Sequence, residues 1–149
     1  MKKIISFLIL LVMLLPIKIN ALENTTTYYE YLNDGSYYEI TIEENSLNTR
    51  STTKSGSKTV KYKNANGEDC WYVKVTGIFT YNGTSATCTS SSVSAGVYKN
   101  NWKIANKTSS KSGASAKASA TARLYYVGAV VDTKTKSITL TCSANGKLS

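Results

Sequence analysis

The stretch DCWYVKVTGIFTYNG, residues 69–83, decides the fold class of this chain. Its apolar side chains recur at every second position, a spacing typical of a β-strand with one buried face. They are Trp71, Val73, Val75, Phe79 and Tyr81, whereas Lys74 takes the opposite face. Gly77 belongs to the buried series, which indicates a bulge or a close approach of another group. The Asn82-Gly83 pair then predicts a tight turn.

Alternation of the same kind continues on both sides of this stretch. Upstream, Val60 and Tyr62 alternate with lysines. Downstream, alanines at every second position from 116 to 122 alternate with Ser, Lys and Thr, and this strict period predicts a strand although alanine favours helices. Further short strands are expected around Ala86 and Cys88 and around Trp102 and Ile104.

The last expected strand contains one irregularity. Ile138, Leu140 and Cys142 share a face, and Lys134 and Lys136 fall in the same phase. Because lysines are rarely buried, a turn or bulge is expected between them and Ile138.

An acidic hairpin is predicted before these strands. The segments TYYEYL (27–32) and SYYEITI (36–42) flank Asn33-Asp34-Gly35, a strong tight-turn signal, and Tyr38, Ile40 and Ile42 share one face. Residues 46–57 are polar and are expected to form a linker. With seven or more short strands, the chain predicts an all-β fold, an antiparallel β-sandwich, Ig-like in size, with an N-terminal β-hairpin arm.

The first 21 residues have the pattern of a signal peptide. Lys2 and Lys3 precede an apolar run, and Ile19 and Ala21 suit the positions before a cleavage site. The run is short for a membrane span. The expected organisation is therefore a signal peptide (1–21) cleaved after Ala21, an acidic arm (22–49) and a basic β-sandwich domain (50–149) of a secreted protein that does not span a membrane once processed.

Charge is divided unevenly between the two mature parts. Residues 22–49 hold six acidic and no basic residues, whereas residues 50–149 hold 15 basic and three acidic residues. The parts should attract each other, so the arm could lie on the body; a mobile tail or a pro-segment is the other arrangement left open. The basic residues on expected outward positions are candidates for binding a polyanion, although a merely solvated face has the same pattern: Lys61, Lys63, Lys74, Lys103, Lys117 and Arg123.

Three cysteines allow three single-bridge choices. Cys88 and Cys142 both lie on the apolar parity of their strands, so this pairing is favoured. It would close a loop of 54 residues, worth about 4 kcal/mol in the chain-entropy model. Cys70 has the opposite parity to Trp71 and is expected to be an exposed free thiol, which Glu68 and Asp69 keep protonated.

Most catalytic chemistry is excluded by composition. The chain has no histidine, which excludes Ser-His-Asp and Cys-His nucleophiles and histidine metal sites. No CxxC pair occurs, and residues 50–149 hold only the carboxylates of Glu68, Asp69 and Asp132, so neither a zinc site nor a paired-carboxylate glycosidase is indicated. We expect no catalytic residue, no metal, no cofactor and no enzymatic activity.

Three segments carry a resemblance: GEDCWYVKVTGIFTYNGTSATCTS (67–90), NNWKIANKTSSKSG (100–113) and SITLTCSANGKLS (137–149). They resemble an uncharacterised family of small secreted β-rich proteins of Gram-positive bacteria, the Clostridia and relatives. The resemblance implies cysteines at positions 88 and 142 and supports their bridge, and Cys70 departs from it. It implies no activity and no ligand.

Two functions follow as expectations. The first is a secreted non-enzymatic binding protein that docks through its basic face on an anionic envelope or host surface. Its partner would be a cell-wall polymer, a glycan or a lipid surface, and nucleic acid is not expected for an exported protein. The second is a secreted antibacterial or toxin-like effector that the acidic arm holds inactive. The oligomeric state is left open.

Overall fold

A computed structural model describes residues 24–45 and 52–149 of the chain. These residues form two antiparallel β-sheets, which confirms the all-β prediction. The strands are β1 (Asn24–Tyr31), β2 (Tyr37–Asn45), β3 (Thr53–Lys63), β4 (Asp69–Tyr81), β5 (Ala86–Val97), β6 (Trp102–Ser112), β7 (Ser115–Tyr126) and β8 (Ala129–Thr141). Among the described residues, the structure has no helix that could serve as a membrane span. The expected signal peptide and Leu22 lie outside this part of the chain.

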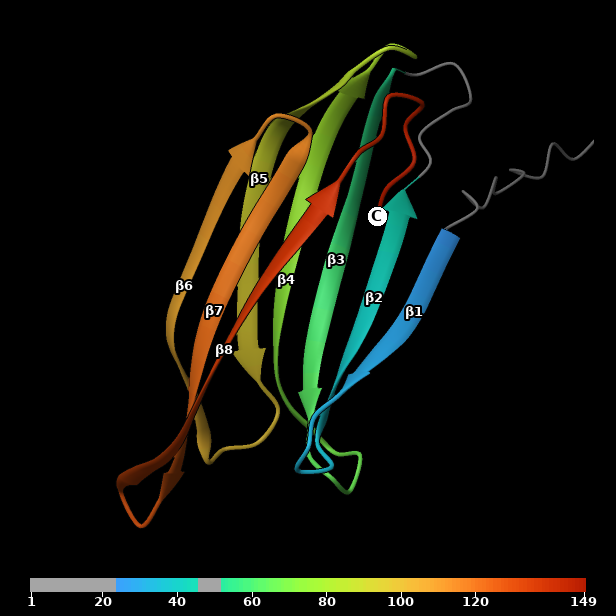
Figure 1. Cartoon of the computed structure of the whole chain (residues 1–149). Helices are drawn as coiled ribbons and strands as arrows, with labels where there is room; N and C mark the ends of the chain where they lie inside the picture. The colour runs from blue at the N-terminus through green and yellow to red at the C-terminus, as the bar shows by residue number, and fades with distance from the viewer. Residues whose placement is uncertain (1–23, 46–51) are drawn as a thin grey trace, which may run out of the picture.

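Each strand pairs with its neighbour in sequence inside its own sheet. The first sheet has the order β1-β2-β3-β4-β5 and the second β6-β7-β8. The three-stranded sheet lies in front of the five-stranded one, and β1 and β2 extend beyond it on one side (Figure 1). Short connections between consecutive strands explain this simple topology, because a tight turn returns the chain antiparallel to the strand it has just left.

The core lies between the two sheets. Val73, Val75 and Phe79 of β4 are fully buried, in one cluster with the alternating alanines of β7, from Ala116 to Ala122. Gly77 allows this close packing: a Cβ atom there would lie 2.5 Å from the Phe79 ring and 3.0 Å from Ala116. The predicted close approach at Gly77 is confirmed.

Aromatic rings join the sheets at one end of this core. Trp71 of β4 lies 6.1 Å from Tyr62 of β3 and 6.4 Å from Trp102 of β6, measured between ring centroids. Tyr38 of β2 contacts both Tyr62 and Trp71. Burial raises the pKa of Tyr38 to about 12, so its hydroxyl stays protonated inside this cluster. Strand β2 therefore belongs to the core.

Part of the expected linker is strand. Strand β3 begins at Thr53, and its residues 55–63 pair with the whole of β2. Gly56 is buried against Leu148, and Ser57 is buried with its hydroxyl donating to the Glu43 carboxylate at 3.0 Å. The linker prediction is thus wrong for residues 53–57, because they extend β3, and the side chains of Lys54 and Ser57 bond to Glu44 and Glu43 of β2. Residues 46–51 lie outside the described part.

No bulge separates the two lysines from Ile138 in β8. Lys136 and Lys134 pair with Ala120 and Ala122 in unbroken register, so the predicted irregularity is wrong. Lys136 instead reaches from β8 to β1 and β2, with its Nζ atom 2.6 Å from the Glu30 carboxylate and 4.2 Å from the centroid of the Tyr38 ring. The carboxylate of Glu30 and the ring of Tyr38 thus compensate the cost of partly burying this ammonium group.

Cys70 is buried, contrary to its predicted exposure. The register between β3 and β4 shifts at this point: Tyr62 pairs with Trp71, but Lys63 pairs with Asp69. Cys70 is the extra residue of this bulge, and a bulge interrupts the alternation of side chains between faces. Cys70 and Trp71 can therefore both be buried.

Candidate functional site

The six predicted anion-binding residues do not form one face. Lys61, Lys63 and Lys74 belong to β3 and β4 in the five-stranded sheet, whereas Lys103, Lys117 and Arg123 belong to β6 and β7 in the other sheet. Within β4 and β7 they alternate with the buried side chains of each sheet. The structure therefore divides the predicted site between the two outer surfaces of the molecule.

The lysines of the five-stranded sheet are neutralised. Lys63 Nζ lies 2.6 Å from the Asp69 carboxylate, Lys61 Nζ lies 3.3 Å from it, and both lie 3.7 Å from Glu39. Lys74 pairs with Glu43 at 3.3 Å. Burial alone would raise the pKa of Asp69, but hydrogen bonds from Lys63 and Lys61 outweigh it and hold this pKa below its ordinary value. These cations stabilise the sheet and leave little charge for a ligand.

The predicted cations of β6 and β7 have no acidic partner among the described residues. Lys103, Lys117 and Arg123 are exposed, and none of them forms an ion pair with any residue that the structure describes. Lys103 and Arg123 are cross-strand neighbours, and Lys103 Nζ lies 4.8 Å from the centroid of the Tyr125 ring. We call these three residues the β6–β7 basic surface.

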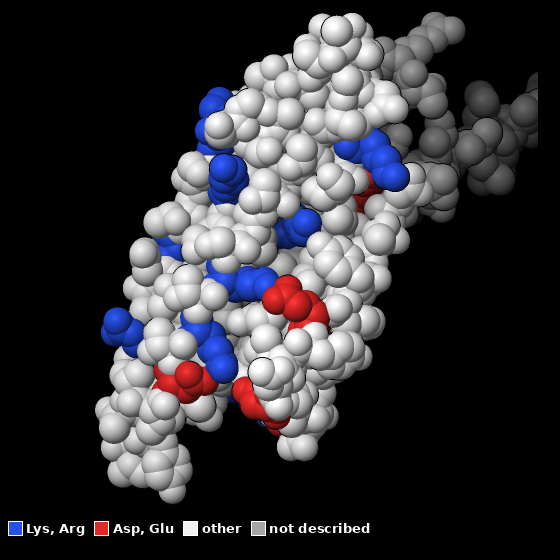
Figure 2. Space-filling view, in the orientation of Figure 1, with Lys and Arg blue, Asp and Glu red and all other residues white. Residues whose placement is uncertain are grey.

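Two further lysines of β6 add to this charge. Lys107 and Lys111 are exposed, and Lys111 Nζ donates to the carbonyl of Thr89 at 2.6 Å. The sequence predicted only a short strand around Trp102 and Ile104, so these two lysines fell beyond it, whereas β6 continues to Ser112. A signal was available in the sequence, since no acidic residue occurs between Asp69 and Asp132. Figure 2 accordingly shows basic and no acidic side chains at the upper left of the molecule.

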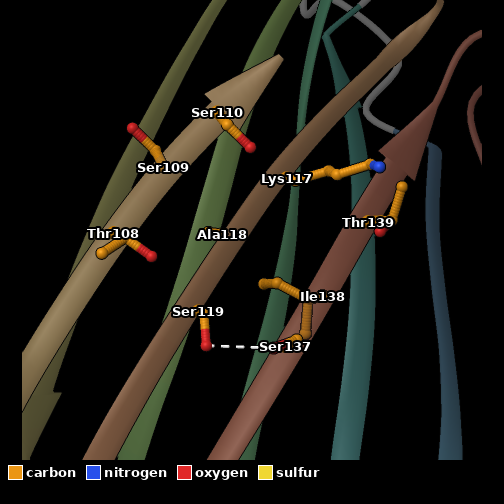
Figure 3. Close-up of a pocket in the computed structure, with 9 residues that line it drawn as sticks. All are labelled: Thr108, Ser109, Ser110, Lys117, Ala118, Ser119, Ser137, Ile138 and Thr139. Atoms are coloured by element: carbon orange, nitrogen blue, oxygen red, sulfur yellow. Dashed lines mark hydrogen bonds between the residues drawn. The ribbon is translucent and has the colours of Figure 1, made fainter. Parts of the chain in front are cut away.

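Hydroxyl groups occupy the outer face between these cations. Ser119 and Thr121 of β7 bond to Ser137 and Thr135 of β8 at 3.0 and 2.9 Å. A shallow hollow of about 290 Å³ crosses the three strands here, and Lys117 is the charged residue among those that line it (Figure 3). An ammonium group surrounded by hydroxyls can donate hydrogen bonds to phosphate, sulfate or carboxylate oxygens.

All three cysteines are buried free thiols, so the structure lacks the predicted Cys88–Cys142 bridge. The sulfurs lie against carbonyl oxygens instead, Cys88 Sγ 3.2 Å from Ser90 and Cys142 Sγ 3.4 Å from Ser143. The parity behind the prediction is confirmed, because both residues are buried.

The two cysteines also flank the same turn. The Cys88 and Cys142 amides donate to the adjacent carbonyls of Gly113 and Ala114. Burial raises the pKa of all three thiols, which opposes a nucleophilic role. A bridge between Cys88 and Cys142 stays a prediction.

The described residues contain no group of three or more Cys, Asp or Glu side chains that could hold a metal ion. No protein-family model matches the chain, and searches of curated proteins and of solved structures find no similar protein. The function must therefore be inferred from the chain's own surface.

Proposed function

We propose that this chain is a secreted, non-enzymatic binding protein, a β-sandwich of Ig-like size with an N-terminal hairpin, that docks on an anionic surface. The observation that supports docking is the β6–β7 basic surface, whose cations have no acidic partner among the described residues. Of the six residues that the sequence suggested, the proposed site keeps Lys103, Lys117 and Arg123. Lys107 and Lys111 add to it at the edge of the sheet.

Unpaired cations on an acid-free surface attract polyanions. Their fields add because no neighbouring carboxylate cancels them, and this raises both the local concentration of an anionic ligand and its association rate. Ion pairs such as Lys63–Asp69 contribute little to that field. Binding through exposed cations weakens as salt rises, since the Debye length falls to about 8 Å at physiological ionic strength.

The spacing of the cations favours an extended ligand over a small anion. Arg123 and Lys103 are adjacent, but Lys117 lies six residues further along β7, about 20 Å at the rise of a β-strand. A single phosphate cannot reach both ends. A polymer or a surface with repeated phosphate or carboxylate groups can.

The test compares two triple variants with the same loss of charge. One carries Lys103→Gln, Lys117→Gln and Arg123→Gln; the control carries Lys58→Gln, Lys99→Gln and Lys147→Gln. Binding to purified Gram-positive cell walls rich in phosphate polymer is measured at low and high salt. If each cation contributes about 1 kcal/mol, the first variant should bind about 100-fold more weakly than wild type at low salt, and the control much less so.

The proposal would be contradicted if the two variants bound equally well. It would also be contradicted if the affinity of the wild-type protein did not change with salt concentration.

A further inference from the structure

The turn between β7 and β8 carries an exposed apolar tip, formed by Tyr126, Val127, Val130 and Val131. These residues are 72%, 88%, 47% and 56% exposed, respectively. The seven residues 125–131 include no charge. The hairpin projects beyond the rest of the molecule at the lower left of Figure 1, and its end is uncharged in Figure 2. Such a concentration of apolar surface marks an interaction site in a soluble domain.

The backbone at this tip is strained in a way that packing does not explain. Tyr126 pairs with Ala129, so Val127 and Gly128 form a two-residue hairpin turn. Both have positive φ, 48° and 79°, as the primed turns of hairpins require. Asn and Gly adopt this conformation readily, whereas it is unfavourable for a β-branched residue. Val127 is 88% exposed and contributes nothing to the core, so its apolar side chain occupies a position where Asn would fold more easily.

We propose that the apolar tip inserts into the interface of an anionic lipid bilayer, with Arg123 and Lys103 contacting the headgroups. The proposal rests on the proposed function and specifies its surface as lipid. Val127 lies four positions after Arg123, about 13 Å along the strand. Apolar groups of interfacial proteins lie about 5–10 Å inside the headgroup boundary. The hairpin therefore places its cations at headgroup level when the valines reach the acyl chains.

The other charges at the base of the hairpin do not oppose this orientation. The carboxylate of Asp132 is paired with Lys134 at 3.5 Å. Tyr126 presents an apolar ring and a polar hydroxyl, the combination enriched at membrane interfaces. Backbone pairing continues up to the turn, between Tyr125 and Val130 and between Tyr126 and Ala129. This pairing satisfies the inward-directed backbone groups of the hairpin, and shallow insertion keeps those on its two outer edges within reach of headgroups and water.

A lipid surface fits the tip better than the other occupants do. An anionic polymer would use the cations but has no need of four exposed apolar side chains. A second copy of the chain would need about 20–30 residues on each side for a stable interface, far more than the tip provides.

Vesicle binding separates this inference from the proposed function. The tip variant carries Tyr126→Ser, Val127→Asn and Val131→Thr; its control, Tyr29→Ser with Ile78→Thr, removes exposed apolar groups elsewhere. Vesicles of phosphatidylglycerol and phosphatidylcholine in equal amounts are sedimented with the protein recovered from culture supernatant. The tip variant should bind about tenfold more weakly or worse, from the loss of buried apolar area, while its binding to cell walls and its unfolding midpoint do not fall.

The outcomes distinguish the two proposals. The variant that lacks Lys103, Lys117 and Arg123 should lose binding to both vesicles and cell walls. If it loses both but the tip variant binds vesicles like wild type, the lipid inference is wrong and the anionic-surface proposal stands. Wild-type protein that binds walls but not vesicles, or a dimer in sedimentation equilibrium that the tip variant abolishes, also overturns the inference.

Insertion can be observed directly with a tryptophan at the tip. Tyr126→Trp fluorescence should be quenched by brominated phosphatidylcholine mixed into the anionic vesicles, whereas that of Tyr29→Trp, on strand β1, should not. Trp71 and Trp102 are buried and provide a constant background. Equal quenching of the two variants would show that the tip does not insert.

Discussion

Val127 is the exception among the residues with left-handed backbone. The other positive φ values of the described chain belong to glycines, as at Gly35 and Gly83 in the turns after β1 and β4. Glycine has no Cβ and adopts this conformation without steric cost. A valine that does so in an exposed turn therefore indicates that its side chain, and not its backbone preference, is what the position requires.

A single substitution tests this conclusion through stability. Val127→Asn should raise the free energy of unfolding by about 1 kcal/mol, because Asn-Gly suits a primed hairpin turn. The thermal midpoint should rise by about 3–5 °C. Val131→Asn, which places the same polar group at an ordinary strand position, serves as the control. A Val127→Asn protein that unfolds at lower urea concentration than wild type would contradict the strain argument.

At the scale of the element, strands β3 and β4 place two predicted anion-binding lysines in ion pairs that stabilise the sheet. Lys61 and Lys63 lie on the outer face, as predicted, but the bulge at Cys70 places Asp69 beside them, and β2 brings Glu39 from the other side. Four charged groups on three strands thus neutralise one another. Their lysine side chains are 32% and 15% exposed, so the network is screened less than an open surface pair.

This network predicts a pH dependence of stability. The pKa of Asp69 in the folded protein lies below its ordinary value, whereas in the unfolded chain it lies near 4. The carboxylate therefore stabilises the fold above about pH 4, and this contribution is lost as the pH falls through the folded-state pKa. Asp69→Asn should lower the unfolding free energy by about 0.5–1 kcal/mol at neutral pH, and the deficit should shrink under acid conditions.

Urea titrations across this pH range measure the effect. Lys103→Gln removes an unpaired cation of the other sheet and should show no such pH-dependent difference. A deficit of Asp69→Asn that stays constant down to pH 2 would exclude the proposed role of the carboxylate.

At the scale of the whole molecule, acidic residues of the first hairpin form ion pairs with basic residues of the last strand. Glu30 and Asp34 of the first hairpin pair with Lys136 and Lys134 of β8. The same hairpin buries three apolar side chains of β2 in the core: Tyr38, Ile40 and Ile42. Residues 24–45 thus lie on the basic body as part of its sheet, which is one of the arrangements left open by the sequence.

Removal of this segment should prevent folding. A chain of residues 50–149 loses the burial of Tyr38, Ile40 and Ile42, each worth about 1.5–3 kcal/mol, and exposes the unpaired edge of β3. We expect broad amide resonances and aggregation on gel filtration, compared with a chain that begins at Leu22. A monomeric, well-dispersed spectrum of the truncated chain would instead favour a removable pro-segment and the effector function.

The sequence by itself determined that the chain forms antiparallel strands, and it showed which side chains face inward at Val73, Phe79 and the alanines of β7. It could do so because the alternation of side chains is a local property of extended backbone. Only the tertiary structure decided which cations are free. Lys136 meets Glu30 from 106 positions away, and Lys63 meets Asp69 across a bulge, contacts that depend on how strands are paired. The burial of Cys70 and the exposure of the 125–131 tip were decided in the same way, because registers and sheet boundaries are set by packing between distant strands.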